Sequence, residues 1–450
     1  MSEGFWTLDT VAQALGGGPA GPRRLRRIVS DSRTLEPGDV FIALRGENFD
    51  GHDFLPEVVA RGAGAVVVST LRREARLGVP IYQVPDTLVA LGQLARYWRT
   101  VWGRTVVAVA GSNGKTSTKD LIAAALSTRF SVHATTGNLN NRIGVPATLL
   151  AVPPGADLAV VELGTSLPGE VGMLREIALP EIVVVTCVAE EHLEGLGDLE
   201  GVLREETAAY QGADVAIAPA DQPEIAAAAR TLARQTVSAG VQDGDLRADS
   251  WQLNDDGRGS LVVEGVTVSP PLRGMHNLRN TMLALAAARA CGISMEDASR
   301  GIGSMPLPKM RSAWHELGTA VLINDAYNAN PGSTRAAIEL LRSVPGGRQR
   351  VIVLGTMREL GARSAEYHEE MARLALDCAD IVAGVGDFEL ALRQMPAGNA
   401  VVVTAADVDA LWYVLEPHLA TDALILLKAS RGVRLERLVP RLEEWAARAA

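Results

Sequence analysis

Several residue types are scarce in this sequence, and each shortage excludes a class of protein. The 450 residues include three cysteines, Cys187, Cys291 and Cys378, whose wide spacing fits neither a disulfide framework nor a metal-binding motif. No apolar run approaches the ~18 residues that a membrane-spanning helix needs. The first residues lack the basic segment followed by an apolar one that marks a secretion signal. We therefore expect free thiols, no membrane insertion and a cytoplasmic location.

Acidic residues outnumber basic ones, and lysine is scarce. The net charge is -10, which disfavours nonspecific binding to nucleic acid, because such binding needs a basic surface. Only four of the 43 basic residues are lysines: Lys115, Lys119, Lys309 and Lys428. Since arginine is used everywhere else, each lysine is a candidate for a specific role.

The order of apolar segments predicts an α/β protein of three domains. Residues 1–84 combine short apolar strands with polar turns and predict a small mixed α/β domain. Residues 85–312 alternate strands of the buried type with helical segments, which is typical of a doubly wound parallel sheet covered by helices. Residues 313–450 repeat that alternation and predict a second doubly wound, Rossmann-like domain.

A glycine-rich loop joins a strand to a helix in VVAVAGSNGKTSTKD, residues 106–120. Its glycines let backbone amides approach phosphate oxygens, and the helix presents its positive N-terminal end. In such a loop the lysine reaches the β- and γ-phosphates, and the threonine hydroxyl binds Mg²⁺. A plain glycine turn is the alternative. The pattern favours nucleotide binding by Gly111, Ser112, Asn113, Gly114, Lys115, Thr116 and Ser117.

Two further strands end in side chains suited to a divalent cation. Glu162 closes the apolar strand LAVVE, and His192 follows the apolar strand IVVV after a short loop. Because the carboxyl ends of parallel strands share one edge of a sheet, both should lie beside the phosphate loop. A carboxylate and an imidazole there can bind Mg²⁺ or Mn²⁺, although each residue alone is more often a solvated, capping or structural group.

Three asparagines precede an apolar helix between the phosphate loop and Glu162. They are Asn138, Asn140 and Asn141. One asparagine at such a place caps a helix or forms a turn. Three within four positions also suggest amides that orient a polar substrate, and the sequence leaves both interpretations open.

The segment EEHLEGLGDLEGVLREETA, residues 190–208, sets His192 among seven carboxylates. A charge-rich segment is usually a solvated surface, and we expect that for the carboxylates around Asp198 and Glu200. Within this segment, His192 is the predicted cation ligand, because it follows an apolar strand.

Seven motifs together resemble the Mur ligases of bacterial cell-wall synthesis. They are, in order, GSNGKTSTK, TTGNLNNRIGVP, VELGTSLPGEV, HLEG, GMHNLRNTMLALAAA, INDAYNANPGS and LKASRGVRLE. The resemblance covers essentially the whole chain and implies a UDP-sugar domain, a central P-loop ATPase domain and a C-terminal domain that closes over the site. PGDVFIAL, DGHDF and NDAYNANP resemble the type that joins D-Ala-D-Ala to UDP-MurNAc-tripeptide.

The resemblance implies roles for single residues. Arg311 would reach the γ-phosphate, and Asp325 the ribose of ATP. Asn280, in an H-N-x-x-N motif with His276 and Asn277, would contact adenine. Tyr327, Asn328 and Asn330 would lie near the nucleotide or the dipeptide. The uridine nucleotide would bind at Ser32, Arg33, Gly46, Asp50, Gly51 and His52.

The implied reaction uses ATP and Mg²⁺. The tripeptide carboxylate attacks the γ-phosphate to give an acyl phosphate and ADP, and the amine of D-Ala-D-Ala then displaces phosphate. Because two anions react, cations should supply most of the catalysis: Lys115, one Mg²⁺ at Thr116, and a second at Glu162 and His192. A monomer would thereby complete the UDP-MurNAc-pentapeptide of peptidoglycan in the last cytoplasmic step.

Glu206 departs from the family pattern. The family usually has a lysine there, which is carbamylated and supports the second metal ion. Here the sign of the side chain is reversed, and a carboxylate is retained. We hypothesise that Glu206 replaces the carbamate as a metal ligand, directly or through water; a glutamate on the helix surface is the alternative. Thr356 also departs, since the family usually has aspartate at that position.

Two other functions fit parts of the pattern. An amide ligase of the same superfamily could serve another pathway, such as folate polyglutamylation, but the DGHDF segment argues against that pathway. A noncatalytic nucleotide-binding protein could keep the fold, but the joint presence of Lys115, Thr116, Glu162, His192 and Arg311 argues against it.

Overall fold

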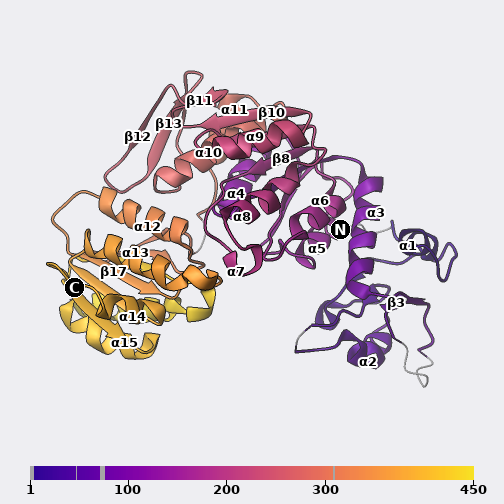
Figure 1. The fold of residues 1–450 in the computed structure, drawn as a ribbon. Coiled ribbons are helices and arrows are strands. Elements are labelled where there is room, and N and C mark those ends of the chain that lie inside the picture. Colours follow the sequence, from indigo (N-terminus) through magenta and orange to yellow (C-terminus); the bar gives the residue numbers. More distant parts are fainter. Residues whose placement is uncertain (1–4, 47, 71–76, 308–309, 450) are drawn as a thin grey trace.

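The computed structural model describes residues 5–46, 48–70, 77–307 and 310–449, so Lys309 lies outside the described residues. Four sheets follow one another along the chain, and the predicted α/β class is confirmed (Figure 1). The domain boundaries near residues 84 and 312 stay a prediction. The three cysteines are free, as expected. In the described parts of the chain, no helix combines the length and the apolarity that crossing a membrane requires.

The first sheet is parallel, with the order β1-β2-β3-β4. Alternate side chains of its middle strands face opposite sides: Val40 and Val67 pack in one apolar cluster, and Phe41 and Val66 in another. Its elements are α1 (Leu8–Leu15), β1 (Ile28–Val29), η1 (Ser32–Thr34), β2 (Val40–Ile42), η2 (Gly51–Phe54), α2 (Leu55–Ala60), β3 (Ala65–Val68) and β4 (Ile81–Gln83).

Helix α3 (Thr87–Trp102) connects the first sheet to the next part of the chain. It starts at Asp86, whose carboxylate accepts hydrogen bonds from the Leu88 and Val89 amides, and it ends at Gly103. It packs against α1 on one side and against two helices of the central part, α5 (Gly144–Leu150) and α6 (Glu170–Ala178), on the other. Figure 1 shows α3 standing between the two parts.

The central sheet has seven parallel strands in the order β11-β10-β9-β8-β5-β7-β6. The chain places β6 and β7 on one side of β5 and β8 to β11 on the other, so the strand order reverses at β5. In α/β sheets, ligands bind at such a point, at the carboxyl ends of the strands. The strands are β5 (Thr105–Ala110), β6 (Val132–Ala134), β7 (Leu158–Glu162), β8 (Ile182–Val185), β9 (Val215–Pro219), β10 (Gln235–Gly240) and β11 (Leu246–Arg247).

Helices cover both faces of the central sheet. Val107 and Val109 of β5 belong to one apolar cluster and Val106 and Ala108 to another, as expected for a strand buried on both sides. α4 (Lys115–Leu126), α10 (Met275–Ala290) and α11 (Met295–Gly303) share the first cluster; α5, α6, α8 (Leu199–Thr207) and α9 (Pro223–Leu232) share the second. The short α7 (Leu193–Leu196) and η3 (Ala208–Tyr210) flank α8, and β12 (Ser250–Leu253), β13 (Gly259–Val263) and β14 (Val266–Val268) form a small antiparallel sheet.

The C-terminal sheet has the order β15-β16-β20-β17-β18-β19, and only the β15–β16 pair is antiparallel. Its strands are β15 (Ala313–Leu317), β16 (Ala320–Asp325), β17 (Arg350–Gly355), β18 (Ile381–Val385), β19 (Val401–Ala405) and β20 (Leu424–Lys428). One face carries α12 (Pro331–Ser343), α13 (Ser364–Leu376) and α14 (Asp387–Arg393), and the other α15 (Val408–Leu415) and α16 (Leu438–Ala449). The short helices are η4 (Gly361–Arg363), η5 (Glu416–His418), η6 (Arg431–Val433) and η7 (Leu435–Arg437).

Candidate active site

A cleft of about 1170 Å³ lies between the carboxyl ends of the central strands and the C-terminal sheet. Most of the predicted nucleotide and metal residues come together there, but Gly111, Asn330 and Glu206 are not among the lining residues. Glu206 lies beneath the phosphate loop, against the Gly111 amide. Lining the cleft are Ser112 to Ser117, Asn138, Asn140, Asn141, Glu162, His192, His276, Asn277, Asn280, Arg311, Asp325, Tyr327, Asn328 and Lys428.

The phosphate loop is shaped by two glycines. Gly111 has φ +115°, and a Cβ there would lie 2.2 Å from Thr186 Oγ1, so no other residue fits without rearrangement. Gly114, with φ +79°, is the N-cap of α4 and provides no side chain to cap it. The first amides of α4 are therefore left for a ligand, as phosphate binding at a helix N-terminus requires.

Lys115 folds back over this loop. Its Nζ donates to the carbonyl oxygens of Gly111 at 2.6 Å and Ser112 at 3.2 Å. Burial alone would lower the pKa of Lys115, but the carboxylates of Glu191, Glu206 and Glu162 raise it above the usual value. The side chain is therefore a fixed positive charge beside the loop.

Thr116 and Glu162 form the part of the site that suits Mg²⁺. Thr116 Oγ1 donates to Glu162 Oε2 at 2.9 Å, and Asn140 Nδ2 donates to Glu162 Oε1 at 2.8 Å. Glu162 is 2% exposed, and its amide donates to Thr135 Oγ1. A hydroxyl and a carboxylate, fixed side by side, fit an ion that keeps several of its waters.

Glu191 is a site residue that sequence reasoning missed. Its Oε2 is buried and accepts no hydrogen bond within the described part of the chain; Lys115 Nζ lies 3.8 Å away. An orphaned carboxylate oxygen facing the phosphate loop is suited to a cation. The signal was present, because Glu191 follows a buried strand as Glu162 closes one.

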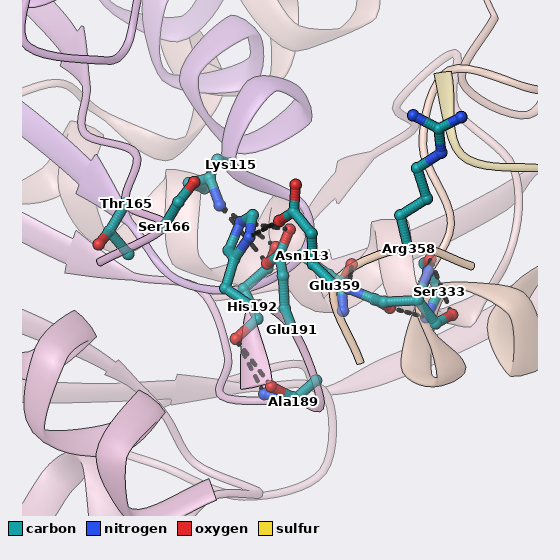
Figure 2. A network of polar contacts seen from close by, with 12 residues as sticks. Asn113, Lys115, Thr165, Ser166, Ala189, Glu191, His192, Ser333, Arg358 and Glu359 are labelled. Atoms are coloured by element: carbon teal, nitrogen blue, oxygen red, sulfur yellow. Dashed lines mark hydrogen bonds and ion pairs between the residues drawn. The ribbon is translucent and has the colours of Figure 1, made fainter. Parts of the chain in front are cut away.

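His192 lies between Glu191 and the C-terminal sheet, as Figure 2 shows. Its Nε2 is 3.4 Å from Glu191 Oε1, and its Nδ1 pairs with Glu359. Burial would lower the pKa of His192, but Glu191 and Glu359 raise it above its ordinary value. Glu359 had not been considered from the sequence.

Glu206 is buried, which excludes the alternative of a surface glutamate. It is 1% exposed, and its Oε2 accepts a hydrogen bond from the Gly111 amide at 2.7 Å. Burial raises the pKa of Glu206 to about 7, against the attraction of Lys115. In the described residues, no three His, Cys, Asp or Glu side chains form a metal-ligand group, so the joint metal role of Thr116, Glu162, His192 and Glu206 stays a prediction. Glu200, by contrast, is exposed, as expected.

The three asparagines Asn138, Asn140 and Asn141 make different contacts. Asn141 Oδ1 accepts hydrogen bonds from the Ile143 and Gly144 amides, which explains it as a turn and helix-start residue. Asn140 instead orients Glu162, and Asn138 lines the cleft. The turn and helix-start interpretation therefore applies to Asn141, and a role of Asn138 and Asn140 in orienting a substrate stays a prediction.

The nucleotide residues lie around α10 and the C-terminal sheet. Asn280 lies under Gly114 and donates to Asn277 Oδ1, while the Arg311 guanidinium lies 4.3 Å from the Tyr327 ring centre. Asp325 pairs with Lys428, and its Oδ1 accepts a hydrogen bond from the Ser312 amide. Lys428, to which no specific role was assigned from the sequence, thus balances the charge of Asp325.

The six predicted uridine-nucleotide residues lie in loops and short helices between the strands of the first sheet, and they do not line this cleft. Asp50 caps η2 and accepts a hydrogen bond from the His52 amide, and His52 Nε2 accepts one from the Ser69 amide. Gly51 packs against the backbone of Leu44, where a Cβ would lie 2.8 Å from the carbonyl oxygen. Gly46 lies in the loop after β2, Ser32 is the first residue of η1, and Arg33 pairs with Asp31. Their ligand role stays a prediction.

Three domain descriptions match successive parts of the chain: "Mur ligase family, catalytic domain" at residues 24–99, "Mur ligase middle domain" at 109–288 and "Mur ligase, glutamate ligase domain" at 310–431. The UDP-N-acetylmuramoyl-tripeptide–D-alanyl-D-alanine ligase of Bacillus subtilis is 35% identical, over 97% of this chain and 98% of the relative. The chain belongs to the Mur ligase family. The ligase of the same name from Escherichia coli is 34% identical to this Mur ligase, over 97% and 98% of the two chains.

Solved structures agree with this Mur ligase along its length. MurF from Acinetobacter baumannii superposes with a TM-score of 0.88 at 32% identity, covering 98% of this chain and 99% of the other. The MurF ligase of Thermotoga maritima, solved in complex with ADP, superposes with a TM-score of 0.83 at 28% identity, covering 94% and 99%. The three-part fold implied by the motifs is thereby confirmed.

Proposed function

We propose that this Mur ligase joins D-alanyl-D-alanine to UDP-N-acetylmuramoyl-tripeptide and converts ATP to ADP and phosphate. The observation that carries the proposal is the single cleft in which the phosphate loop, the Thr116–Glu162 pair and the C-terminal residues Asp325 and Asn328 face one another. Relatives bearing this activity in their names align over nearly the whole chain.

ATP would bind with its phosphates at the N-terminus of α4. The free amides of that helix and Lys115 would hold the phosphate oxygens, and Arg311 would approach from the C-terminal side of the cleft. Asn280, beneath Gly114, would lie toward the adenine. Asp325 and Tyr327 also line the cleft and would lie near the ribose.

Thr116 and Glu162 would hold Mg²⁺, with Glu191 and His192 available to a second ion. Bound there, the metal would neutralise charge on the phosphates, which two reacting anions require. The orphaned Oε2 of Glu191 supports the assignment, because a buried carboxylate oxygen without a hydrogen-bond donor is unfavourable.

The chemistry proceeds in two displacements. A carboxylate oxygen of the tripeptide attacks the γ-phosphorus, the bond to the β-phosphate oxygen breaks, and ADP leaves. The dipeptide amine then attacks the acyl carbon, phosphate leaves with the amine proton, and the amide remains. Lys115 and the α4 amides would stabilise the negative charge in the first displacement, because both lie at the phosphate loop.

The remaining parts of the proposal concern the whole enzyme. The first sheet, with Ser32, Arg33, Gly46, Asp50, Gly51 and His52, would bind the uridine nucleotide. Residues 1–84, 85–312 and 313–450 would be the UDP-sugar, ATPase and ligase domains of a cytoplasmic monomer that completes the pentapeptide precursor of peptidoglycan.

Phosphate release tests the proposal. ATP and UDP-MurNAc-tripeptide are supplied with and without D-Ala-D-Ala, and we expect sustained release only with the dipeptide. Release that does not depend on the dipeptide would contradict the proposed acceptor. Omission of the UDP-MurNAc-tripeptide is the matched control for simple ATP hydrolysis.

A further inference from the structure

Two side-chain contacts join the C-terminal part of the chain to the phosphate-binding side of the central sheet. Asn330, at the start of α12, donates to Asn113 Oδ1 of the phosphate loop at 2.9 Å. Glu359, in the loop after β17, pairs with Nδ1 of His192, and its backbone oxygen accepts a hydrogen bond from the Glu194 amide at 3.2 Å.

The backbone on both sides of this second contact is constrained. His192 has φ +53° and Glu359 has φ +64°, a region that residues other than glycine rarely adopt. Such conformations persist where the surroundings impose them. Leu360 is 2% exposed and anchors the loop, and a Cβ on Gly361 would lie 3.5 Å from the Glu194 nitrogen. The constrained backbone and the buried Leu360 therefore hold the Glu359 carboxylate against His192.

The contact fixes the direction of the imidazole. A carboxylate accepts hydrogen bonds, so the hydrogen must be on Nδ1 of His192, and Nε2 is directed toward Glu191, 3.4 Å away. Glu191 in turn lies 3.8 Å from Lys115. Figure 2 shows Glu359, His192, Glu191 and Lys115 converging on one point.

We propose that Glu359 is a positioning residue, which orients His192 only when the C-terminal sheet lies against the central sheet. Glu359 thereby links the arrangement of the domains to assembly of the phosphate-binding site. Its side chain is 52% exposed, so the pair contributes little to stability and can break and re-form. The kinetic consequence rests on the proposed function; the orientation of His192 does not.

Turnover tests the kinetic consequence. Glu359→Ala should lower kcat roughly tenfold to a hundredfold, the cost usual for removing a carboxylate that orients a functional histidine. The KM for ATP should not change, because Glu359 does not line the nucleotide cleft. Glu359→Gln keeps an acceptor oxygen and should recover part of the rate. The matched control is Glu194→Ala, which removes an exposed carboxylate in α7 but keeps the backbone amide that contacts Glu359; it should behave as wild type.

A double-mutant cycle separates positioning from a general structural effect. If Glu359 acts through His192, Glu359→Ala should cause no further loss of kcat in a His192→Gln background. Additive losses would overturn the proposal, since they would mean that Glu359 acts independently of the imidazole.

Nitrogen NMR of labelled histidines provides a readout that needs no turnover. The wild type should show His192 with its hydrogen on Nδ1, and Glu359→Ala, but not Glu194→Ala, should change that pattern. Unchanged His192 resonances in Glu359→Ala would overturn the inference. If the wild type failed to release phosphate with the dipeptide, the proposed function would be wrong, and the NMR result would still decide the role of Glu359.

Discussion

At the scale of single residues, one ammonium group and three carboxylates set the charge of the phosphate site. Lys115 lies in the field of Glu191, Glu206 and Glu162. Glu162 and Glu191 face the cleft, whereas Glu206 supports the loop from below. Two carboxylates would therefore lie beside the phosphates, so we expect an added divalent cation to favour nucleotide binding.

Glu206→Gln tests the hypothesis that the Glu206 carboxylate supports the metal site in place of a carbamate. The amide can still accept the hydrogen bond from the Gly111 amide, so the variant removes charge while keeping the contact. We expect turnover to fall roughly tenfold, as for other groups that support a metal site, with more Mg²⁺ needed for half-maximal rate. The measurement is a Mg²⁺ titration of phosphate release.

Bicarbonate provides the control for this prediction. Wild-type activity should not respond to it, because the carboxylate is part of the chain and needs no carbon dioxide. Activation of the wild type by bicarbonate, or a Glu206→Gln variant with normal Mg²⁺ dependence, would rule out the hypothesis and leave Glu206 as an anchor of the loop.

His276 should make the stability of α10 depend on pH. Burial lowers the pKa of His276 to about 4, against the attraction of Asp325. Between pH 4 and 6.5 the unfolded state therefore binds more protons, so the contribution is fully present above pH 6.5 and is lost as pH falls. From pH 7.5 to 5 the loss is about 2 kcal/mol, at ~1.4 kcal/mol per pKa unit.

Hydrogen exchange of the α10 amides at the two pH values measures this loss. The difference should shrink in His276→Gln, which cannot be protonated. The same pH dependence in both proteins would show that other groups cause it.

At the scale of elements, the phosphate loop depends on the backbone of Gly111. Gly111→Ala would place a Cβ 2.2 Å from Thr186 Oγ1 at φ +115°. We expect destabilisation by roughly 2 kcal/mol and loss of ATP binding, since the loop must shift. Thermal unfolding and ATP titration check this. Gly172→Ala, within α6 and with open space around it, should instead stabilise by up to ~1 kcal/mol; a similar loss in both variants would contradict the argument.

The elements found from the sequence were those with strong apolar runs. β5, β7 and β8 were predicted because they are buried on both faces, so their residues alone identify them. The small sheet β12–β14 and strand β15 were missed. Both carry many exposed or half-buried side chains, and their pairing depends on neighbours rather than on composition.

The contacts that could be predicted from the sequence are those between residues at the same edge of the central sheet. The pairing of Thr116 with Glu162 follows from strand ends that share that edge. The contacts of His192 with Glu359 and of Asn113 with Asn330 join residues 167 and 217 positions apart, so only the domain arrangement determines them. Glu206 is buried although its helix, α8, is rich in charge, because one face of that helix packs on the core.

The role of Thr356, a departure from the family pattern, also depends on a contact that the sequence does not reveal. Its hydroxyl accepts a hydrogen bond from the Asp387 amide at the start of α14. A Cβ on Gly386 would lie 2.3 Å from that hydroxyl, so the two positions are fitted to each other. The sequence left the consequence of Thr356 open, and the structure gives it a role in holding a loop end.

At the scale of the whole molecule, three sheet-bearing parts lie in a row, and the site forms where two of them meet (Figure 1).

A substitution at Asn330 tests the contact between the central and C-terminal parts. Asn330→Ser keeps an N-cap for α12 but is too short to reach Asn113, so kcat should fall while the free energy of unfolding changes by less than about 0.5 kcal/mol. Unchanged kcat, or a large loss of stability in denaturation, would contradict this.

The most direct measurement follows one oxygen atom. UDP-MurNAc-tripeptide carrying ¹⁸O in its C-terminal carboxylate is incubated with ATP, Mg²⁺ and D-Ala-D-Ala, and the released phosphate is analysed by mass spectrometry. Attack of the carboxylate on the γ-phosphorus followed by displacement at the acyl carbon predicts one ¹⁸O transferred to phosphate for each amide formed. Amide formation with unlabelled phosphate would contradict the acyl-phosphate route, and release of phosphate without amide would contradict ligation.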